Sequence, residues 1–352
     1  MKFLHVVGAR PNFPKLAPVF RAGRSAGIQQ FILHTGQHYD ESLSGSFFRD
    51  LELPSPDFNL GVGSGSHAVQ TARIMERFEP VLINTAPNWL VVYGDVNSTL
   101  ATALVASKLG VRIAHVEAGL RSGDRSMPEE INRIVADRLA DLLLTPSHAA
   151  SDTLKREGES PSKIVFVGNV MIDSLFHALP SAKATGATAR IGDRGNHVVV
   201  TLHRPSNVDE PVRLKEIISA LKVIAARKLV IFPMHPRTRE RLSSIGEDLG
   251  DIRVLDSLPY HEMLDLVDSA CGVITDSGGL QEETTALGIP CFTIRNNTER
   301  PVTVTEGTNQ LVLNPADLPA LIAEGQRTIP SPKLDGWDGS AGERVLDALK
   351  SH

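Results

Sequence analysis

The chain has 352 residues, of which 41% are hydrophobic and 22% charged, and its formal net charge is −5. This length predicts two domains, each large enough for its own core, and the ordinary composition is typical of a soluble globular protein. The acidic balance argues against a nucleic-acid-binding protein, and no apolar stretch reaches the length of a membrane span.

Short apolar runs alternate with helical patterns along the first half of the chain. Such runs are typical of buried parallel strands, and the helical patterns between them predict βαβ units in a doubly wound sheet. The expected strands are Phe3–Val7, Gln30–His34, Trp89–Tyr93, Arg112–Val116, Leu142–Thr145 and Ile164–Val167, with helices over Ser98–Leu109 and Glu129–Leu139 among them.

A second series of strands follows a small-residue region at 180–195. Its expected strands are His197–Leu202, Lys228–Phe232, Ile252–Leu255, Gly272–Thr275 and Cys291–Ile294. The fold class is therefore α/β, with two Rossmann-like doubly wound domains facing a cleft. We expect residues 1–168 to form the first domain, joined by a terminal helix at 341–352, and residues 169–340 to form the second.

The two cysteines, Cys271 and Cys291, both stand beside apolar, strand-like residues. We interpret them as buried thiols of a protein in the reducing cytoplasm. The N-terminal run Phe3–Val7 is too short for the apolar core of a signal peptide. Because no Cys/His cluster has the spacing of metal ligands, we expect neither a metal nor another cofactor.

The stretch from Ile274 to Glu283 combines the end of a strand, two glycines and the start of a helix. Free N–H groups and the helix dipole favour an anion at such a turn, and glycine lets a phosphate approach the backbone. The pattern therefore predicts a phosphate-bearing ligand, although the same turn also serves as a plain connection between strand and helix.

Charged residues follow several of the expected strands, where open α/β sheets bind their ligands. Arg10 and Lys15 follow the first strand, near a positive helix end, and an anionic partner explains them better than surface exposure. Asp95 follows the strand Trp89–Tyr93 and also suits a helix N-cap. Glu117 follows the next strand along the chain and is less easily explained as a cap.

One predicted helix carries a polar face. Glu129, Asn132 and Arg133 have the spacing i, i+3 and i+4, which places them together. Such a face either meets solvent or lines a cleft.

In the second half, His203 and His235 each follow a strand, and a histidine beside a phosphate can carry charge. Arg300 is a candidate anion clamp, since arginine suits bidentate phosphate contacts, and a solvated loop charge is its alternative.

Taken in order, these motifs resemble the non-hydrolysing UDP-N-acetylglucosamine 2-epimerase family over most of the chain. The motifs are Gly8-Ala9-Arg10-Pro11, Gly-Asp at 94–95, His-Val-Glu-Ala-Gly-Leu-Arg at 115–121, Pro-Glu-Glu-x-Asn-Arg at 128–133, His203-Arg204, Thr-Asp-Ser-Gly-Gly-x-Gln-Glu-Glu at 275–283 and Thr-Glu-Arg-Pro at 298–301.

The resemblance implies a fold of the glycosyltransferase-B type, a UDP-sugar substrate in the interdomain cleft and a homodimer. It implies that UDP is bound by Arg10, Ser277, Gly278, Gly279 and Glu283, with Glu283 on the ribose hydroxyls. It also implies positions around the sugar and diphosphate for Lys15, Asp95, Glu117, Glu129, Arg133, His203 and Arg300.

The family inverts C2 of the sugar by eliminating UDP to a 2-acetamidoglucal and adding it back. One face of C2 needs a base and the other an acid, and Asp95, Glu117 and Glu129 suit these roles without an assignment of faces. His203, Lys15 and the arginines suit the charge that develops on the leaving diphosphate. No metal is needed in this scheme.

The chain departs from well-studied bacterial members at 36–44, where Gln37 and His38 are kept and later positions of the helix that holds an allosteric substrate are changed. Activation by substrate is therefore left open. The Gln-His-Tyr-Asp sequence at 37–40 resembles a subgroup that includes epimerases of UDP-2,3-diacetamido-glucuronate. A glycosyltransferase of the same fold and a non-catalytic nucleotide-sugar-binding protein are the alternatives, and the three carboxylates argue against both.

Overall fold

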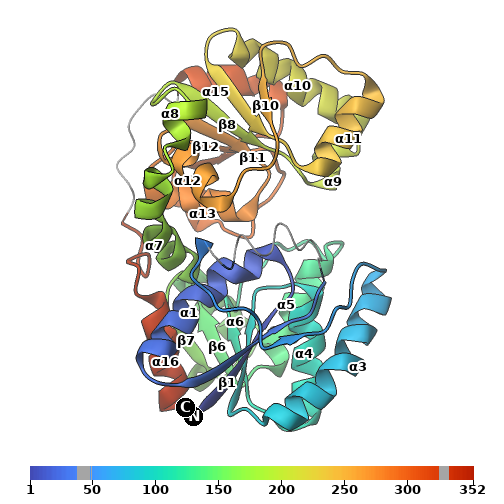
Figure 1. The fold of residues 1–352 in the computed structure, drawn as a ribbon, viewed down its shortest axis with the longest axis vertical. Helices are drawn as coiled ribbons and strands as arrows, with labels where there is room; N and C mark the ends of the chain where they lie inside the picture. The colour runs from blue at the N-terminus through green and yellow to red at the C-terminus, as the bar shows by residue number, and fades with distance from the viewer. Residues whose placement is uncertain (38–47, 49, 325–332) are drawn as a thin grey trace. The chain divides into compact units, whose positions relative to one another are not determined.

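The computed structural model describes residues 1–37, 48, 50–324 and 333–352. The chain divides into two compact units, one of Met1–His177 with Asp335–His352 and one of Ala178–Leu334. Each unit contains a parallel sheet with helices on it (Figure 1).

Within its described residues, the first unit has a seven-stranded parallel sheet in the order β3-β2-β1-β4-β5-β6-β7. This is the strand order of the Rossmann fold with one strand added, and the direction of winding reverses between β1 and β4. The strands are β1 (Lys2–Val7), β2 (Gln29–His34), β3 (Phe58–Asn59), β4 (Trp89–Tyr93), β5 (Ile113–Val116), β6 (Leu142–Thr145) and β7 (Ile164–Phe166).

Helices cover both faces of this sheet, as a doubly wound fold requires. Leu4 and Leu90 of the strands pack against Phe78 of α3 in one part of the core. The helices are α1 (Phe13–Ser25), α3 (His67–Thr85), α4 (Asn97–Lys108), α5 (Pro128–Leu139), α6 (His148–Arg156) and α16 (Ala341–Ser351), with short turns η1 (Arg10–Asn12) and η2 (Pro161–Lys163).

The second unit repeats the Rossmann order in its described residues, with six parallel strands ordered β10-β9-β8-β11-β12-β13. Its winding reverses between β8 and β11. The strands are β8 (His197–Thr201), β9 (Leu229–Pro233), β10 (Arg253–Leu255), β11 (Gly272–Thr275), β12 (Cys291–Thr293) and β13 (Asn309–Leu311).

Val200 and Ile274 of this sheet pack against Ile218 of α10 in the core of the second unit. The helices are α8 (Ala187–Ile191), α9 (Pro205–Val208), α10 (Pro211–Ala225), α11 (Pro236–Ile245), α12 (Tyr260–Asp268), α13 (Gly278–Leu287), α14 (Val302–Thr305) and α15 (Leu318–Glu324), with the turn η3 (Pro315–Asp317).

Helix α7 (Val170–Ala184) carries the chain from the first unit into the second, and the division falls within it rather than at Gly168. Its first turns belong to the first unit because Ser174 Oγ donates to Pro14 O (2.5 Å) and Gly342 N donates to Asp173 Oδ2 (2.7 Å). The helix runs on to Ala184 and contains Pro180.

The expected strands are confirmed, and no end differs from its expected position by more than one residue. Two edge strands, β3 and β13, were not predicted because they have two and three residues and carry polar side chains. Within the described residues, no helix combines the length and the apolarity that crossing a membrane requires.

Helix α16 lies against α1 in the first unit (Figure 1). A Cβ at Gly342 would lie 2.7 Å from the backbone of Pro18, so the two helices approach as closely as glycine allows. Near the other end of α16, Trp89 Nε1 donates to Leu349 O (3.0 Å), and the Arg112 guanidinium lies 3.9 Å from the Trp89 ring centroid.

Candidate active site

Charged side chains of the first unit gather where β1, β4 and β5 end, at the switch point of the sheet. Lys15 lies in the first turn of α1, Asp95 follows β4, and Glu117 follows β5. Lys15 is 5% exposed and Glu117 8%. Three segments far apart in the sequence thus place these groups at one edge of the sheet.

Lys15 and Glu117 form a buried ion pair beside Gly94. Gly94 has φ 61°, and a Cβ there would lie 2.7 Å from Lys15 Nζ and 3.1 Å from Glu117 Oε2. Glu117 itself has φ 73°, which is uncommon for a residue with a side chain. The site therefore requires glycine at 94 and holds Glu117 in a strained backbone.

Arg133 joins Asp95 to helix α5. Its guanidinium is buried and contacts both Asp95 and Glu130, the latter at 2.5 Å. Asn132 Nδ2 donates to Asp95 O (2.9 Å), so α5 holds both the side chain and the backbone of this residue. Although burial raises the pKa of Glu130, hydrogen bonds from the Ser122 and Gly123 backbone and the Arg133 charge lower it below its ordinary value.

The structure differs from the expected polar face of α5 in one member. Asn132 and Arg133 are buried as a cleft-lining face would require, whereas Glu129 is exposed and the neighbouring Glu130 pairs with Arg133. Because each helical residue turns the side-chain direction by about 100°, Glu130, Arg133 and Asp137 form the buried stripe instead.

His115 and Asp137 form a buried network that the sequence analysis missed. His115 Nδ1 lies 2.7 Å from Asp137 Oδ1, and His115 Nε2 lies 2.8 Å from Gly94 O. Since a carbonyl oxygen can only accept, Nε2 carries the hydrogen in that contact. Asp137 also accepts from Gly119 N (3.2 Å) and pairs with Arg121 (2.7 Å). The network therefore anchors the turn at Gly94, which follows β4, to His115 of β5 and Asp137 of α5.

In the second unit, Asp276 organises the end of β8. Its carboxylate accepts from the backbone N–H groups of His203 (3.1 Å) and Arg204 (3.0 Å) and from Asn207 Nδ2 (3.1 Å). His203 Nδ1 lies 2.8 Å from it, and the His203 side chain is 44% exposed. Although burial raises the pKa of Asp276, these contacts, led by His203, lower it below its ordinary value. His203 is therefore held in place while its ring meets solvent.

Helix α13 begins at Gly278, directly after the residue Ser277, and Arg300 lies beside this N-terminus. A Cβ at Gly278 would lie 2.7 Å from Arg300 Nη1, so glycine lets the arginine reach the helix end. Arg300 is buried between Glu299 (2.6 Å) and Glu282 (2.8 Å). The N-terminus with a fixed guanidinium beside it is a built anion site.

Glu283 is buried in α13, and Tyr260 OH donates to its Oε1 (3.1 Å). Burial raises the pKa of Glu283 to about 7, although the Tyr260 hydrogen bond opposes this. Tyr260 was not singled out from the sequence, because the contact joins helices that are distant along the chain.

The structure thus brings the predicted residues together in two groups, one in each unit. The first unit holds Lys15, Asp95, Glu117 and Arg133. The second holds His203, Ser277, Gly278, Gly279, Glu283 and Arg300. The Arg10 side chain and the stretch 38–44, on which we based the question of allosteric activation, lie outside the described residues.

Each of the two Rossmann-like units has charged groups at its switch point, and in the second unit these groups surround a helix N-terminus. This arrangement is typical of α/β enzymes that bind phosphate-bearing ligands. Comparison with known proteins narrows this class. The model of the family described as UDP-N-acetylglucosamine 2-epimerase matches residues 21–350.

The UDP-N-acetylglucosamine 2-epimerase of Methanocaldococcus jannaschii is 42% identical over 99% of this chain and 99% of its own length. The UDP-2,3-diacetamido-2,3-dideoxy-D-glucuronate 2-epimerase of Pseudomonas aeruginosa is 44% identical, also over 99% of each chain. A crystal structure of the M. jannaschii enzyme in complex with UDP-GlcNAc and UDP superposes with a TM-score of 0.92 at 40% identity, covering 100% of both chains.

The chain belongs to the UDP-N-acetylglucosamine 2-epimerase family. The resemblance seen in the sequence is confirmed, as are the expected α/β fold of the glycosyltransferase-B type and the expectation of an isomerase.

The crowding at Gly94 predicts a stability difference between two glycine substitutions. Gly61 has φ 57°, similar to that of Gly94, but in the described part of the chain a Cβ there would have no heavy atom within 4 Å apart from its own residue and its two neighbours in sequence. We expect Gly94→Ala to lower the free energy of unfolding by about 1–3 kcal/mol more than Gly61→Ala. Both variants force an alanine into a backbone with positive φ, but only the alanine at 94 clashes with neighbouring side chains. Urea unfolding of both variants measures this, and equal losses would contradict the geometry.

The raised pKa of Glu283 predicts that stability depends on pH. A carboxyl whose folded pKa lies above its unfolded value, here near 4.5, costs stability as pH rises through both values. Between pH 5 and pH 8 we expect the wild type to lose up to about 3 kcal/mol relative to Glu283→Gln. Urea unfolding across this range tests it, with the exposed Glu240→Gln as control; parallel profiles for all three proteins would refute the raised pKa.

Proposed function

We propose that this protein epimerises UDP-N-acetylglucosamine at C2 to UDP-N-acetylmannosamine, by eliminating UDP and adding it back through a 2-acetamidoglucal. The observation that carries the proposal is the buried group at the switch point of the first unit, where Lys15 pairs with Glu117 and Arg133 pairs with Asp95. The M. jannaschii relative named as this epimerase, and its complex with UDP-GlcNAc and UDP, support the choice of substrate.

The elimination breaks the C2–H bond, and its electron pair becomes the second bond of the C1=C2 double bond. The C1–O bond breaks, and its own electron pair leaves with the UDP oxygen. A carboxylate must take the C2 proton, and the return step must deliver a proton from the other face. Asp95, Glu117 and Glu129 are the carboxylates that we propose for these transfers. Glu117 is already oriented by Lys15, and Asp95 by Arg133, so neither needs to reorganise for the reaction.

The second unit has the groups that a departing UDP needs. The N–H groups of Gly278 and Gly279 at the start of α13 and the Arg300 guanidinium suit the diphosphate, whose negative charge grows as the C1–O bond breaks. His203, held by Asp276, can carry a positive charge beside it. Glu283 offers carboxylate oxygens that suit the ribose hydroxyls.

UDP-2,3-diacetamido-2,3-dideoxyglucuronate is the alternative substrate, because the P. aeruginosa relative named for it is as similar to this chain as the UDP-N-acetylglucosamine 2-epimerase of M. jannaschii. The C2 chemistry is the same for both sugars. The two differ in the acetamido group at C3 and the carboxylate at C6, so the choice between them concerns contacts away from the reacting carbon.

Exchange of the C2 hydrogen with solvent tests the function. In deuterated water, we expect the wild type to place deuterium at C2 of UDP-GlcNAc and to give a gluco/manno mixture by NMR. Glu117→Gln should lower the exchange rate by about 100-fold or more while UDP still binds, because proton transfer loses its carboxylate. Glu79→Gln, an exposed residue of α3, is the matched control.

Retained exchange in Glu117→Gln would refute the role of this residue. Absence of exchange in the wild type with UDP-GlcNAc, followed by exchange with UDP-2,3-diacetamido-glucuronate, would change the substrate. Release of free sugar together with UDP would indicate a hydrolysing enzyme instead.

A further inference from the structure

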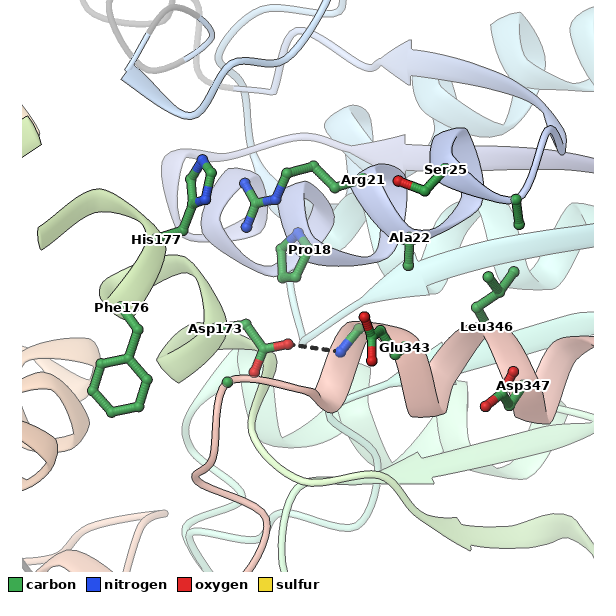
Figure 2. Close-up of a pocket in the computed structure, with 13 residues that line it drawn as sticks. Pro18, Arg21, Ala22, Ser25, Asp173, Phe176, His177, Glu343, Leu346 and Asp347 are labelled. Atoms are coloured by element: carbon green, nitrogen blue, oxygen red, sulfur yellow. Dashed lines mark hydrogen bonds between the residues drawn. The ribbon is translucent and has the colours of Figure 1, made fainter. Parts of the chain in front are cut away.

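A cavity of about 630 Å³ lies on the first unit among α1, α7 and α16 (Figure 2). Its lining from α1 begins at Pro18, one turn beyond Lys15, and so it is separate from the group at the strand ends. This volume is in the range of small-molecule sites. None of the candidate site residues lines it among those that the structure describes.

Asp173 of α7 is the most deeply buried charged group of this cavity, with 6% of its surface exposed. Gly342 N, in the first turn of α16, donates to Asp173 Oδ2, and this contact is drawn in Figure 2. No group in the described part of the chain donates to Asp173 Oδ1. Burial raises the pKa of this carboxyl, although the Gly342 hydrogen bond opposes it. A buried polar atom without a partner costs stability, and a ligand that donates to it would remove that cost.

Arg21 of α1 presents the opposite chemistry. Its Nη1 is buried and, among the described residues, contacts no acceptor within hydrogen-bond distance. Burial lowers the pKa of the guanidinium, and the charge of nearby Asp173 opposes this. Two residues that line the cavity therefore each carry a buried polar atom without a partner among the described residues, Oδ1 of Asp173 and Nη1 of Arg21.

The remaining wall adds negative charge and apolar surface. Glu343 and Asp347 line the cavity from α16, one helical turn apart, and Leu346 lies between them in sequence. With Asp173 they set three carboxylates against the one guanidinium of Arg21. A complementary ligand therefore carries one anionic and two cationic groups on an apolar stem.

We propose that this cavity binds a small molecule with the charge pattern of a basic amino acid. Its carboxylate accepts from Arg21 Nη1, and the neighbouring ammonium donates to Asp173 Oδ1. The second ammonium, at the end of a short aliphatic stem, lies near Glu343 and Asp347. The stem itself packs against the apolar wall at Leu346.

Occupancy of the cavity reaches the candidate active site through two connections. Helix α1 carries both Arg21 and Lys15. Ser174, next to Asp173 on α7, donates to Pro14 O (2.5 Å), directly before Lys15. We therefore expect the ligand to change the rate of C2 exchange at least about twofold, a shift that needs less than 1 kcal/mol. This regulatory part rests on the proposed function, whereas binding does not.

The first test measures binding of L-lysine to the wild-type protein by saturation-transfer NMR and calorimetry. Three matched probes each lack one group: ε-aminocaproate lacks the α-ammonium, cadaverine lacks the carboxylate, and L-norleucine lacks the ε-ammonium. We expect each to bind about tenfold more weakly than L-lysine or worse, since each loses a hydrogen bond between charged groups. No binding of L-lysine, or equal binding of all four compounds, would overturn the proposal.

The second test uses variants of the cavity. Asp173→Asn keeps an acceptor for Gly342 N but loses the charge, and Arg21→Gln shortens and neutralises the guanidinium. Both should weaken L-lysine binding about tenfold or more, whereas Asp152→Asn, which removes an exposed carboxylate on α6, should not. If Asp173→Asn unfolds, Glu343→Gln on the surface of α16 takes its place, and it should also weaken L-lysine binding.

Equal binding of L-lysine by all these variants would place the ligand elsewhere and refute the assignment. Failure of L-lysine to bind while C2 exchange proceeds would overturn this inference alone. Loss of C2 exchange in a wild type that binds L-lysine would instead contradict the proposed function.

Discussion

The buried ion pair between Lys15 and Glu117 is the interaction on which the site of the first unit depends. It ties the first turn of α1 to the end of β5, and it exists because Gly94 leaves room for both side chains. Removing one partner would leave a buried charge without compensation, which is strongly destabilising. Glu117 also has a left-handed backbone conformation, which residues with a side chain rarely adopt, so the surrounding contacts must hold it in place.

The second unit has a local arrangement that suits an anion, although the chain has a net charge of −5. Arg300 already lies between two carboxylates, Glu282 and Glu299, and charge beside Glu299 keeps its pKa well below the ordinary range although burial raises it. The guanidinium is thus fixed in direction without a positive field over the whole surface. Backbone N–H groups at the start of α13 add local attraction at short range. In the binding role that we propose for it, this site would select a phosphate by geometry more than by net charge.

The strands of both sheets could be predicted because buried parallel strands form continuous apolar runs, and the Rossmann order then placed the charged residues at the switch points. The short polar edge strand β13 gave no such pattern. The sequence predicted Glu129 beside Arg133, but the structure has Glu130 there. This difference could not be foreseen, since packing on the sheet decides which neighbouring residue of the helix is buried. His115 with Asp137, like Tyr260 with Glu283, joins elements distant in sequence, and a contact of this kind leaves no local signal.

We propose that the first unit handles the C2 proton while the second holds a UDP that leaves and returns. The most direct measurement supplies the protein with UDP and 2-acetamidoglucal and follows the mixture by proton and phosphorus NMR. We expect both UDP-N-acetylglucosamine and UDP-N-acetylmannosamine to form from these two compounds. If the protein exchanges the C2 hydrogen of UDP-GlcNAc yet forms no UDP-sugar from the pair, elimination and re-addition of UDP is contradicted.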